Sequence, residues 1–365
     1  MIQSIRIQNY KTHVDTTVHL SPLTVLVGPN GAGKSAVLEA LSVPWRVYVA
    51  ARERAWFRDR GHSQGVRCGR EFSELNVSLP GRSIRIMHRV TEGHWLEVTG
   101  DKRVNTPAGP SIVPEARVPQ PVAVGTFAPS EILRLDPKRL REPSYSDELE
   151  PRLGPSGDGL ATVLADLKLQ HPARFETVVA TLKQLVPSVR NVNLQRARVD
   201  RMTLLDPQVD ELGRQTQLSI IDRLVGHELR FDMNSGTDLP ASVVSEGTLH
   251  LLAILTAFYS ASDQEGALIL LDDIDHSLHP SAQRELITFI RELVESTPKL
   301  QVVATTHSPY LVDGLRPEEV VIVNTNAQGV AAAKRLSEHP EHARALSGLS
   351  TGELWSAEGE SWLFD

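Results

Sequence analysis

The sequence predicts an α/β protein whose central sheet is built from both ends of the chain, with a helical lobe inserted between them. Three observations carry this prediction. Short apolar runs alternate with helical periods near the start and near the end of the 365 residues. Helical spacing of apolar residues dominates the middle of the chain. A glycine-rich turn follows an early β-rich run, which is typical of α/β proteins that bind phosphates.

The first part of the chain predicts strands around one helix. Apolar residues alternate over 2–20, which predicts an antiparallel pair, and 23–27 predict a buried strand. A helix is expected from Gly33 or Lys34 toward Trp56. Alternation with punctuating glycines predicts a meander over 72–98, and the proline-rich stretch 105–121 is typical of a linker before a strand at 122–127.

The second part of the chain predicts helices, then mixed strands, and then strands that alternate with helices. Apolar spacing predicts helices over 160–167 and 175–185, strands follow to about Met233, and a helix begins at Glu246. Further strands are expected at 268–271, 300–304 and 320–323, with a helix at 281–294. We therefore expect three parts: 1–140 as the first part of the core with an antiparallel β-subdomain, 141–215 as the helical lobe, and 216–365 as the second part of the core.

Composition excludes several classes of protein. Hydrophobic residues make up 41% and charged residues 23%, as in globular rather than disordered proteins. The net charge of −7 means that any nucleic-acid surface is a local patch. The single cysteine, Cys68, excludes a disulfide framework and a cysteine-based zinc site. The sequence opens without a leader pattern, and no apolar run approaches the ~20 residues of a membrane helix, so we expect a cytoplasmic protein.

One segment matches a phosphate-binding loop in full. It is Gly28-Pro29-Asn30-Gly31-Ala32-Gly33-Lys34-Ser35. Glycines let several N–H groups converge on one phosphate, and the helix that follows adds its partial positive charge. We expect Lys34 to reach the β- and γ-phosphates and Ser35 to offer its hydroxyl to Mg²⁺. The alternative is a chance glycine-rich turn, but the predicted strand before it and helix after it favour nucleotide binding.

Two strand ends carry polar groups suited to hydrolysis. Asp272 and Asp273 follow an apolar strand, and we assign Asp272 to the metal and Asp273 to the general base. The alternative is that both cap the next turn. We expect His307, at the next strand end, to bond the γ-phosphate or the attacking water, with a capping or core histidine as the alternative. His276 and His279 lack a third metal ligand and are assigned to a polar turn.

Five ordered motifs resemble ABC-type ATPases of the SMC/RecF/OLD class, in particular prokaryotic stand-alone AAA-family ATPases. The opening, Ile5-x-Ile7-x-Asn9-Tyr10-Lys11, is also similar to the start of that class. The motifs are the phosphate loop, Ser245-Glu246-Gly247-Thr248, Asp272-Asp273, Ser277-Leu278-His279-Pro280 and Thr306-His307-Ser308-Pro309-Tyr310.

The resemblance implies a P-loop NTPase fold with an ABC-type ATPase head, a mixed sheet, an antiparallel β-subdomain and an inserted helical lobe. It implies ATP and Mg²⁺ as cofactors and a homodimer that encloses ATP head to tail. Ser245 and Gly247 would contact the ATP of the other subunit, although a plain helix N-cap also explains Ser245. His307 would be the switch histidine, and Ser277–Pro280 the loop that joins the two sites.

The sequence departs from the family pattern at several points. Asp273 stands where the class usually has glutamate, which makes slow hydrolysis plausible. The stretch between Ser35 and Ser245 lacks the heptads of an SMC coiled coil. The chain after His307 is too short for the nuclease domain of OLD proteins, so we expect cleavage chemistry to belong to a separate partner. Gln120, between two prolines, is a weak candidate for the Q-loop residue.

The leading functional hypothesis is an ATP-hydrolysing dimer that drives a nucleic-acid or anti-phage defence process with a nuclease or toxin effector. The alternatives are an ATP-gated regulatory module with negligible turnover, motivated by Asp273, and a RecF-like DNA repair ATPase. Three basic clusters either contact phosphates of DNA or RNA or are solvated faces. They are Arg52, Arg54, Arg58 and Arg60; Arg134, Lys138, Arg139 and Arg141; and Arg196, Arg198 and Arg201.

Overall fold

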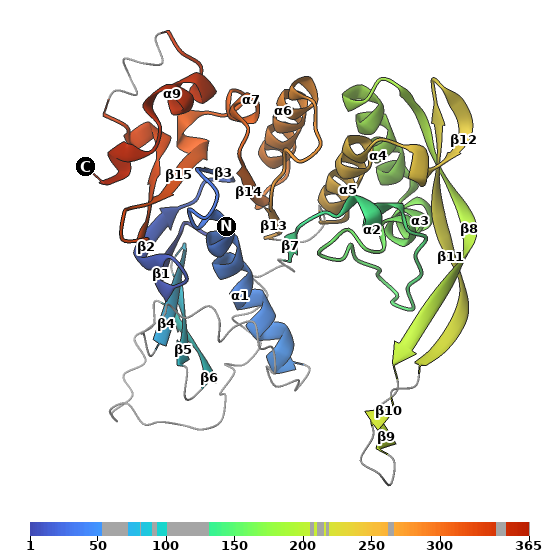
Figure 1. Ribbon diagram of the computed structural model, residues 1–365, viewed down its shortest axis with the longest axis horizontal. Helices are drawn as coiled ribbons and strands as arrows, with labels where there is room; N and C mark the ends of the chain where they lie inside the picture. Colours follow the sequence, from blue (N-terminus) through green and yellow to red (C-terminus); the bar gives the residue numbers. More distant parts are fainter. Residues whose placement is uncertain are drawn as a thin grey trace. The chain divides into compact units, whose positions relative to one another are not determined.

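The chain divides into two compact units (Figure 1). One unit comprises Met1–Ile132 together with Ser262–Asp365, and the other is Leu133–Ala261. The division that the sequence suggests, at residues 140 and 215, stays a prediction. The computed structural model describes residues 1–52, 72–80, 82–89, 93–100, 131–204, 208–209, 215–216, 219–261, 266–340 and 348–364.

A six-stranded mixed sheet forms the centre of the first unit, in the order β16-β15-β3-β14-β13-β7. β3 lies between β14 and β15 and is parallel to both, β13 is parallel to β14, and β16 is antiparallel to β15. The strands are β3 (Leu23–Val27), β7 (Ile132–Leu133), β13 (Leu268–Leu271), β14 (Gln301–Thr306), β15 (Val320–Thr325) and β16 (Ala331–Arg335). Every residue of β3, β13 and β14 is buried, as expected for continuous apolar runs inside a parallel sheet.

The helices of this unit follow the strand ends. They are α1 (Lys34–Arg52), α6 (Pro280–Ser296), α7 (Pro309–Val312) and α9 (Thr351–Glu358), with short 3-10 helices η4 (Pro317–Glu319), η5 (Leu336–Glu338) and η6 (Ser361–Phe364). The predicted helices after residues 33 and 280 are confirmed. The stretch 105–121 and the strand expected at 122–127 lie outside the described residues.

A five-stranded antiparallel sheet, in the order β2-β1-β4-β5-β6, is the second layer of this unit. Its strands are β1 (Ser4–Tyr10), β2 (His13–His19), β4 (Phe72–Leu79), β5 (Arg82–Arg89) and β6 (Gly93–Gly100). The opening pair and the meander that the sequence predicts are therefore confirmed. Ile5 and Ile7 are fully buried while Arg6 between them is exposed, because one face of this sheet packs on the core.

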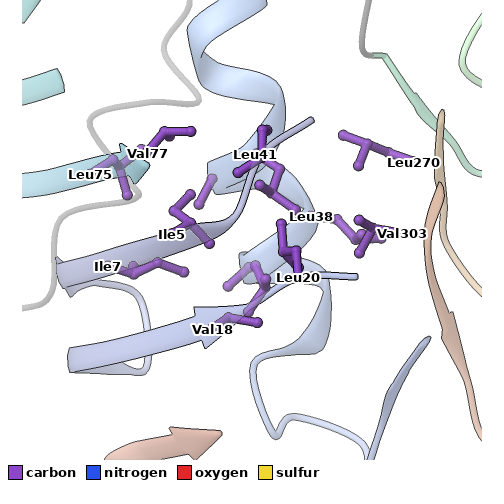
Figure 2. Close-up of a cluster of buried hydrophobic side chains, with 14 of the residues drawn as sticks. Ile5, Ile7, Val18, Leu20, Leu38, Leu41, Leu75, Val77, Leu270 and Val303 are labelled. Atoms are coloured by element: carbon purple, nitrogen blue, oxygen red, sulfur yellow. The ribbon is translucent and has the colours of Figure 1, made fainter. Parts of the chain in front are cut away.

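The core of the first unit lies around α1. Figure 2 shows Leu38 and Leu41 of α1 between the side chains of β1 and β4 and those of β13 and β14. Leu38 is fully buried, and Leu270 and Val303 reach the helix from the central sheet. This packing fixes the start of α1, and with it the glycine-rich loop, against the ends of the central strands.

The second unit combines helices with a three-stranded sheet in the order β12-β11-β8. The helices expected around residues 160, 175 and 246 are confirmed, and the mixed strands prove to be two long ones. The elements are α2 (Pro137–Arg141), α3 (Leu160–Gln170), α4 (Pro172–Leu185), β8 (Val189–Leu204), β9 (Gln208–Val209), β10 (Gln215–Thr216), β11 (Ser219–Met233), β12 (Gly236–Pro240), η3 (Ala241–Val243) and α5 (Glu246–Ala261). Among the described helices of either unit, none is long and apolar enough to cross a membrane.

Candidate nucleotide site

The loop between β3 and α1 needs glycine at three positions. Gly28, Gly31 and Gly33 have φ angles of 142°, 79° and 104°, a region that other residues rarely adopt. A Cβ atom on Gly28 would lie 1.9 Å from the carbonyl oxygen of Val323. The glycines therefore let the backbone curl tightly, as a phosphate-binding loop requires. Pro29, Asn30 and Gly31 form its exposed rim, while Ala32 is buried below.

A buried histidine supports this loop from behind. His13, at the start of β2, has no exposed surface, and its Nε2 lies 3.1 Å from the carbonyl oxygen of Gly33, to which it donates. Burial lowers the pKa of His13, with the bond to Gly33 acting in the opposite direction. A Cβ atom on Gly33 would lie 2.8 Å from this Nε2. No motif in the sequence connects residue 13 to the loop.

Lys34 lies at the first position of α1, and only 5% of its surface is exposed. Its Nζ donates to the carbonyl oxygens of Gly28 and Pro29, at 2.9 and 3.0 Å. Desolvation lowers the pKa of Lys34, while the charges of Asp273 and Asp272 act to raise it. The ammonium group is thus held inside the loop and within electrostatic reach of both aspartates.

Ser35 and Asp272 meet, as two ligands of one metal ion must. The hydroxyl of Ser35 donates to Oδ1 of Asp272 at 3.1 Å, although the two residues are 237 positions apart. Hydroxyl and carboxylate oxygens are the ligands that Mg²⁺ prefers. Within the described residues no cluster of three or more histidine, cysteine or acidic side chains offers another metal site. The donor set therefore fits a Mg²⁺ ion held by Ser35, Asp272 and a nucleotide.

Thr305 joins the two aspartates and was not assigned a role from the sequence. It is fully buried at the end of β14, where its Oγ1 donates to Oδ1 of Asp272 at 2.7 Å. The same oxygen accepts from the backbone N–H of Asp273 at 2.8 Å. The hydroxyl proton and a lone pair of Thr305 are thus both used to orient the end of β13. Asp272 does more than cap a turn, because its carboxylate accepts from two other segments of the chain.

Asp273 is exposed and has a φ of 53°, a left-handed conformation that aspartate tolerates better than most residues. The next acidic residue, Asp275, accepts at 2.6 Å from the hydroxyl of Thr306. His307 follows directly at the end of β14 and is exposed. The ends of the two neighbouring strands therefore present Asp273 and His307 to solvent above a buried network of threonines.

The remaining histidines of this region agree with a polar turn. His279 is the N-cap of α6, where its Nδ1 accepts from the backbone N–H of Ser281 at 3.3 Å. His276 is exposed on the preceding turn. Gln120, and the cluster of Arg54, Arg58 and Arg60, lie outside the described residues.

Ser245 and Gly247 belong to the second unit, at the start of α5. Ser245 is exposed, and its hydroxyl lies 2.7 Å from that of Thr248 and accepts from the Thr248 N–H at 3.3 Å. Ser245 is therefore a helix N-cap, as the plainer interpretation holds. The outer side of the first turn, with half-buried Gly247, is open to solvent, which is compatible with a contact to another molecule.

Comparisons with known proteins show what the chain is similar to. Family models match residues 130–313 ("AAA domain, putative AbiEii toxin, Type IV TA system") and residues 1–43 ("AAA ATPase domain"). The Old nuclease of Escherichia phage P2 is 21% identical over 394 residues, covering 99% of this chain and 66% of that protein. This chain thus spans slightly less than two thirds of that relative.

Two further similarities are to a relative and to a solved structure. The Retron Vc95 probable ATPase of Vibrio cholerae serotype O1 biovar El Tor is 27% identical over 132 residues, which is 36% of this chain and 23% of that protein. A crystal structure of an SMC head bound to the C-winged helix domain of ScpA superposes with a TM-score of 0.58 at 14% identity. It covers 91% of this chain and 96% of that one. The fold is that of an SMC-type α/β ATPase head, and since the first model matches half of the residues, the chain belongs to this AAA domain family, within the P-loop ATPases of the SMC/OLD class.

Proposed function

We propose that the chain binds ATP at Gly28–Ser35 and hydrolyses it at the γ-phosphate in a head-to-tail homodimer. The observation that carries the proposal is the meeting of Ser35, Asp272 and Thr305 beside a loop whose three glycines have positive φ angles. These groups are brought together from the first turn of α1 and from the ends of the neighbouring strands β13 and β14. A turn with a purely structural role would not require these three side chains to meet.

Each residue of the site has a role in the proposed reaction. The N–H groups of Gly31–Ser35 and the start of α1 bind phosphate oxygens, and the ammonium of Lys34 adds a positive charge. Ser35 and Asp272 would hold Mg²⁺, which offsets the negative charge of the phosphates. Asp273 accepts a proton from the water whose oxygen attacks the γ-phosphorus, as the bond from that phosphorus to the bridging oxygen breaks. His307 donates a hydrogen bond to the γ-phosphate.

The second copy supplies the start of α5. Ser245 is exposed and its hydroxyl is held by Thr248 in its own first turn, so the residue is ordered before any partner arrives. N–H groups at a helix start suit a phosphate. We infer that Ser245 and Gly247 of one copy contact the ATP held by the other.

The cycle of closing on ATP and opening after hydrolysis would drive an anti-phage defence or nucleic-acid process in the cytoplasm. Chemistry on the target would belong to a separate nuclease or toxin effector. An ATP-gated module with negligible turnover is the second candidate. The observation that favours it is Asp273, whose side chain is one methylene shorter than the glutamate usual at this position in the class.

Mixing two inactive variants tests the composite site. Lys34→Ala leaves the start of α5 intact, and Ser245→Arg leaves the phosphate loop intact. In a head-to-tail dimer, a mixed pair has one site with both elements intact and one with neither. We expect each variant alone to lack ATP hydrolysis and an equimolar mixture to regain part of the wild-type rate, measured as phosphate release.

The double variant Lys34→Ala/Ser245→Arg, mixed with wild type, is the matched control for subunit exchange. It lowers the rate, because each mixed dimer then has one site that lacks Lys34 and one site that lacks Ser245. A mixture of the single variants that stays inactive, while exchange is shown by this control, contradicts the head-to-tail site. Wild-type protein that binds ATP but shows no turnover favours the gated module.

A further inference from the structure

A two-stranded ribbon extends from the second unit and takes no part in the proposed ATP site (Figure 1). β8 and β11 contain 16 and 15 residues and are paired in register from Ser219↔Leu204 to Asp232↔Asn191. At about 3.4 Å per residue each strand reaches about 50 Å. Near its base the ribbon packs on its own unit, where Leu229 and Phe231 are buried.

One face of the ribbon carries exposed arginines, and we call Arg196, Arg198 and Arg223 the arginine face. The register pairs Arg198 with Val225 and Arg223 with Asp200, so all of these side chains lie on the same side. Arg196 and Arg198 are exposed and make no ion pair with another described residue. Arg223 lies 3.9 Å from Asp200, with 77% of its side chain exposed, a pair that solvent weakens.

The opposite face of the ribbon is different. Arg201 lies there, 3.4 Å from Asp147, and its register partner is Asp222. Further along, Ser144 pairs with His227 at the edge of β11, and a Cβ atom on Gly226 would lie 2.2 Å from the carbonyl oxygen of Ser144. The opposite face is therefore charge-balanced at Arg201. The arginine face is covered at its base, where Leu229 and Phe231 of the same face are buried, and is basic and exposed from Arg196 and Val225 outward, in a chain of net charge −7.

The apolar residues in the outer part of the arginine face are also exposed. Ile221 and Val225 have 60% and 66% of their surface accessible and flank Arg223 on β11. Exposed apolar side chains that lie together on one face can form part of a binding surface. On this face, arginines that can bind phosphates therefore alternate with apolar side chains that can pack on a flat apolar surface.

We propose that the arginine face is a docking surface for double-stranded DNA, with the ribbon lying in the major groove. The major groove of B-form DNA accepts a two-stranded β-ribbon, arginine binds phosphates and guanine edges, and apolar side chains pack on thymine methyl groups. The deep, narrow major groove of A-form RNA does not accept such a ribbon. This inference is independent of ATP hydrolysis.

Two single variants on the same strand test the surface. Arg198→Glu and Arg201→Glu make the same change of charge three residues apart, on opposite faces. Binding to a fluorescent 20-base-pair DNA duplex is measured by anisotropy without nucleotide, at 50 mM salt. We expect Arg198→Glu to weaken binding by about tenfold and Arg201→Glu to leave it near wild type.

Two further measurements, the salt dependence of binding and the binding of an RNA duplex, make the test more specific. Arg198→Ala should lower the slope of log affinity against log salt by about one, since one phosphate contact is lost. An RNA duplex of the same length should bind more weakly than the DNA duplex. Absence of DNA binding by the wild type, equal loss in both glutamate variants, or equal binding of the RNA duplex would overturn the proposal. ATP hydrolysis, assayed separately, reports on the ATP site and checks that each variant is folded.

Discussion

Two hydroxyl groups of this protein are held in opposite ways. Thr305 is fully buried at the end of β14, and its oxygen joins Asp272 and Asp273 of the neighbouring strand end. Ser245 is exposed, and its bonds go to Thr248 and Leu249 in the first turn of its own helix. The first group is fixed by distant parts of the chain, and the second by its immediate neighbours.

The difference indicates which groups can act within one copy and which need another. A group fixed by several strands is oriented toward its own site and has no capacity left for a new ligand. A group fixed by one helical turn keeps its outer side free, so it is ordered and yet available. We therefore expect variants around Thr305 to impair each copy by itself, and variants at Ser245 to impair only the pair.

The largest expected effect separates these two roles at the level of ATP binding. Lys34→Ala removes the buried ammonium of the phosphate loop and should weaken ATP affinity by at least about 10²-fold. Ser245→Arg should leave the ATP affinity of the isolated copy unchanged, because in the proposed dimer Ser245 contacts the ATP of the other copy. Isothermal titration at protein concentrations too low for dimers measures both. An equal loss of ATP affinity in the two variants would contradict this difference between Lys34 and Ser245.

The second effect concerns the exposed Asp273, the proposed general base. Asp273→Asn removes the proton acceptor but keeps the size of the side chain, and turnover should fall on the order of 10²–10⁴-fold. ATP then persists between the two copies, so light scattering should show twice the monomer mass with ATP and the monomer mass without it. The same mass in both conditions would argue against an ATP-held dimer. Asp275→Asn, two residues on, is the matched control.

The third effect tests the buried junction itself. Thr305→Val keeps the shape of the side chain but leaves the Asp273 N–H without its acceptor and removes one of the two donors to Asp272. Loss of such an orienting group typically costs 10- to 100-fold in metal affinity or activity, and we expect the Mg²⁺ dependence of hydrolysis to shift by about that amount. Thr305→Ser keeps the hydroxyl and should restore most activity. Thr288→Val, on the exposed face of α6, is the control, and an unshifted Mg²⁺ curve in Thr305→Val would remove the proposed role.

The smallest effect concerns stability behind the phosphate loop. Burial lowers the pKa of His13 below the ordinary 6.5, so the folded protein keeps this side chain neutral where the unfolded chain takes up a proton. Its contribution to stability is therefore complete above pH 6.5 and falls as the pH drops below that value. Thermal unfolding between pH 8 and pH 5.5 should show a smaller decline in His13→Gln than in wild type. The exposed His19→Gln should follow the wild-type curve.

The residues that a short motif defines could be predicted from the sequence. The phosphate loop needs glycine at positions where the backbone is left-handed, and that need is visible as spacing. The chain also shows where a strand ends in Asp272. Thr305 carries no such signal, because its role depends on the register that pairs Leu271 with Ala304. That register places the next residue of each strand side by side, and it is a property of the folded sheet.

Other features escaped prediction for related reasons. β16 consists of three alanines, a lysine and an arginine, a composition with weak preference for strands, and it forms because β15 offers an antiparallel edge. The long β8–β11 ribbon appears in the sequence as mixed short patterns, because its outer part alternates arginine with isoleucine and valine on an exposed face. The contact of His13 with Gly33 joins two turns that only the packing of β1 and β2 on α1 brings together.

The position of β3 between β14 and β15 determines when the central sheet can form during synthesis. The ribosome releases β3 and the phosphate loop early, but the strands on either side are made almost 300 residues later, as the bond from Ile2 to Gln301 across 299 positions illustrates. At 5–20 residues per second that delay is on the order of tens of seconds. During it, an apolar strand is without its sheet, and the loop is without the carboxylates that would share its metal ion. We therefore expect the nascent chain to acquire the proposed affinity for nucleotide late, once β13 and β14 are in place.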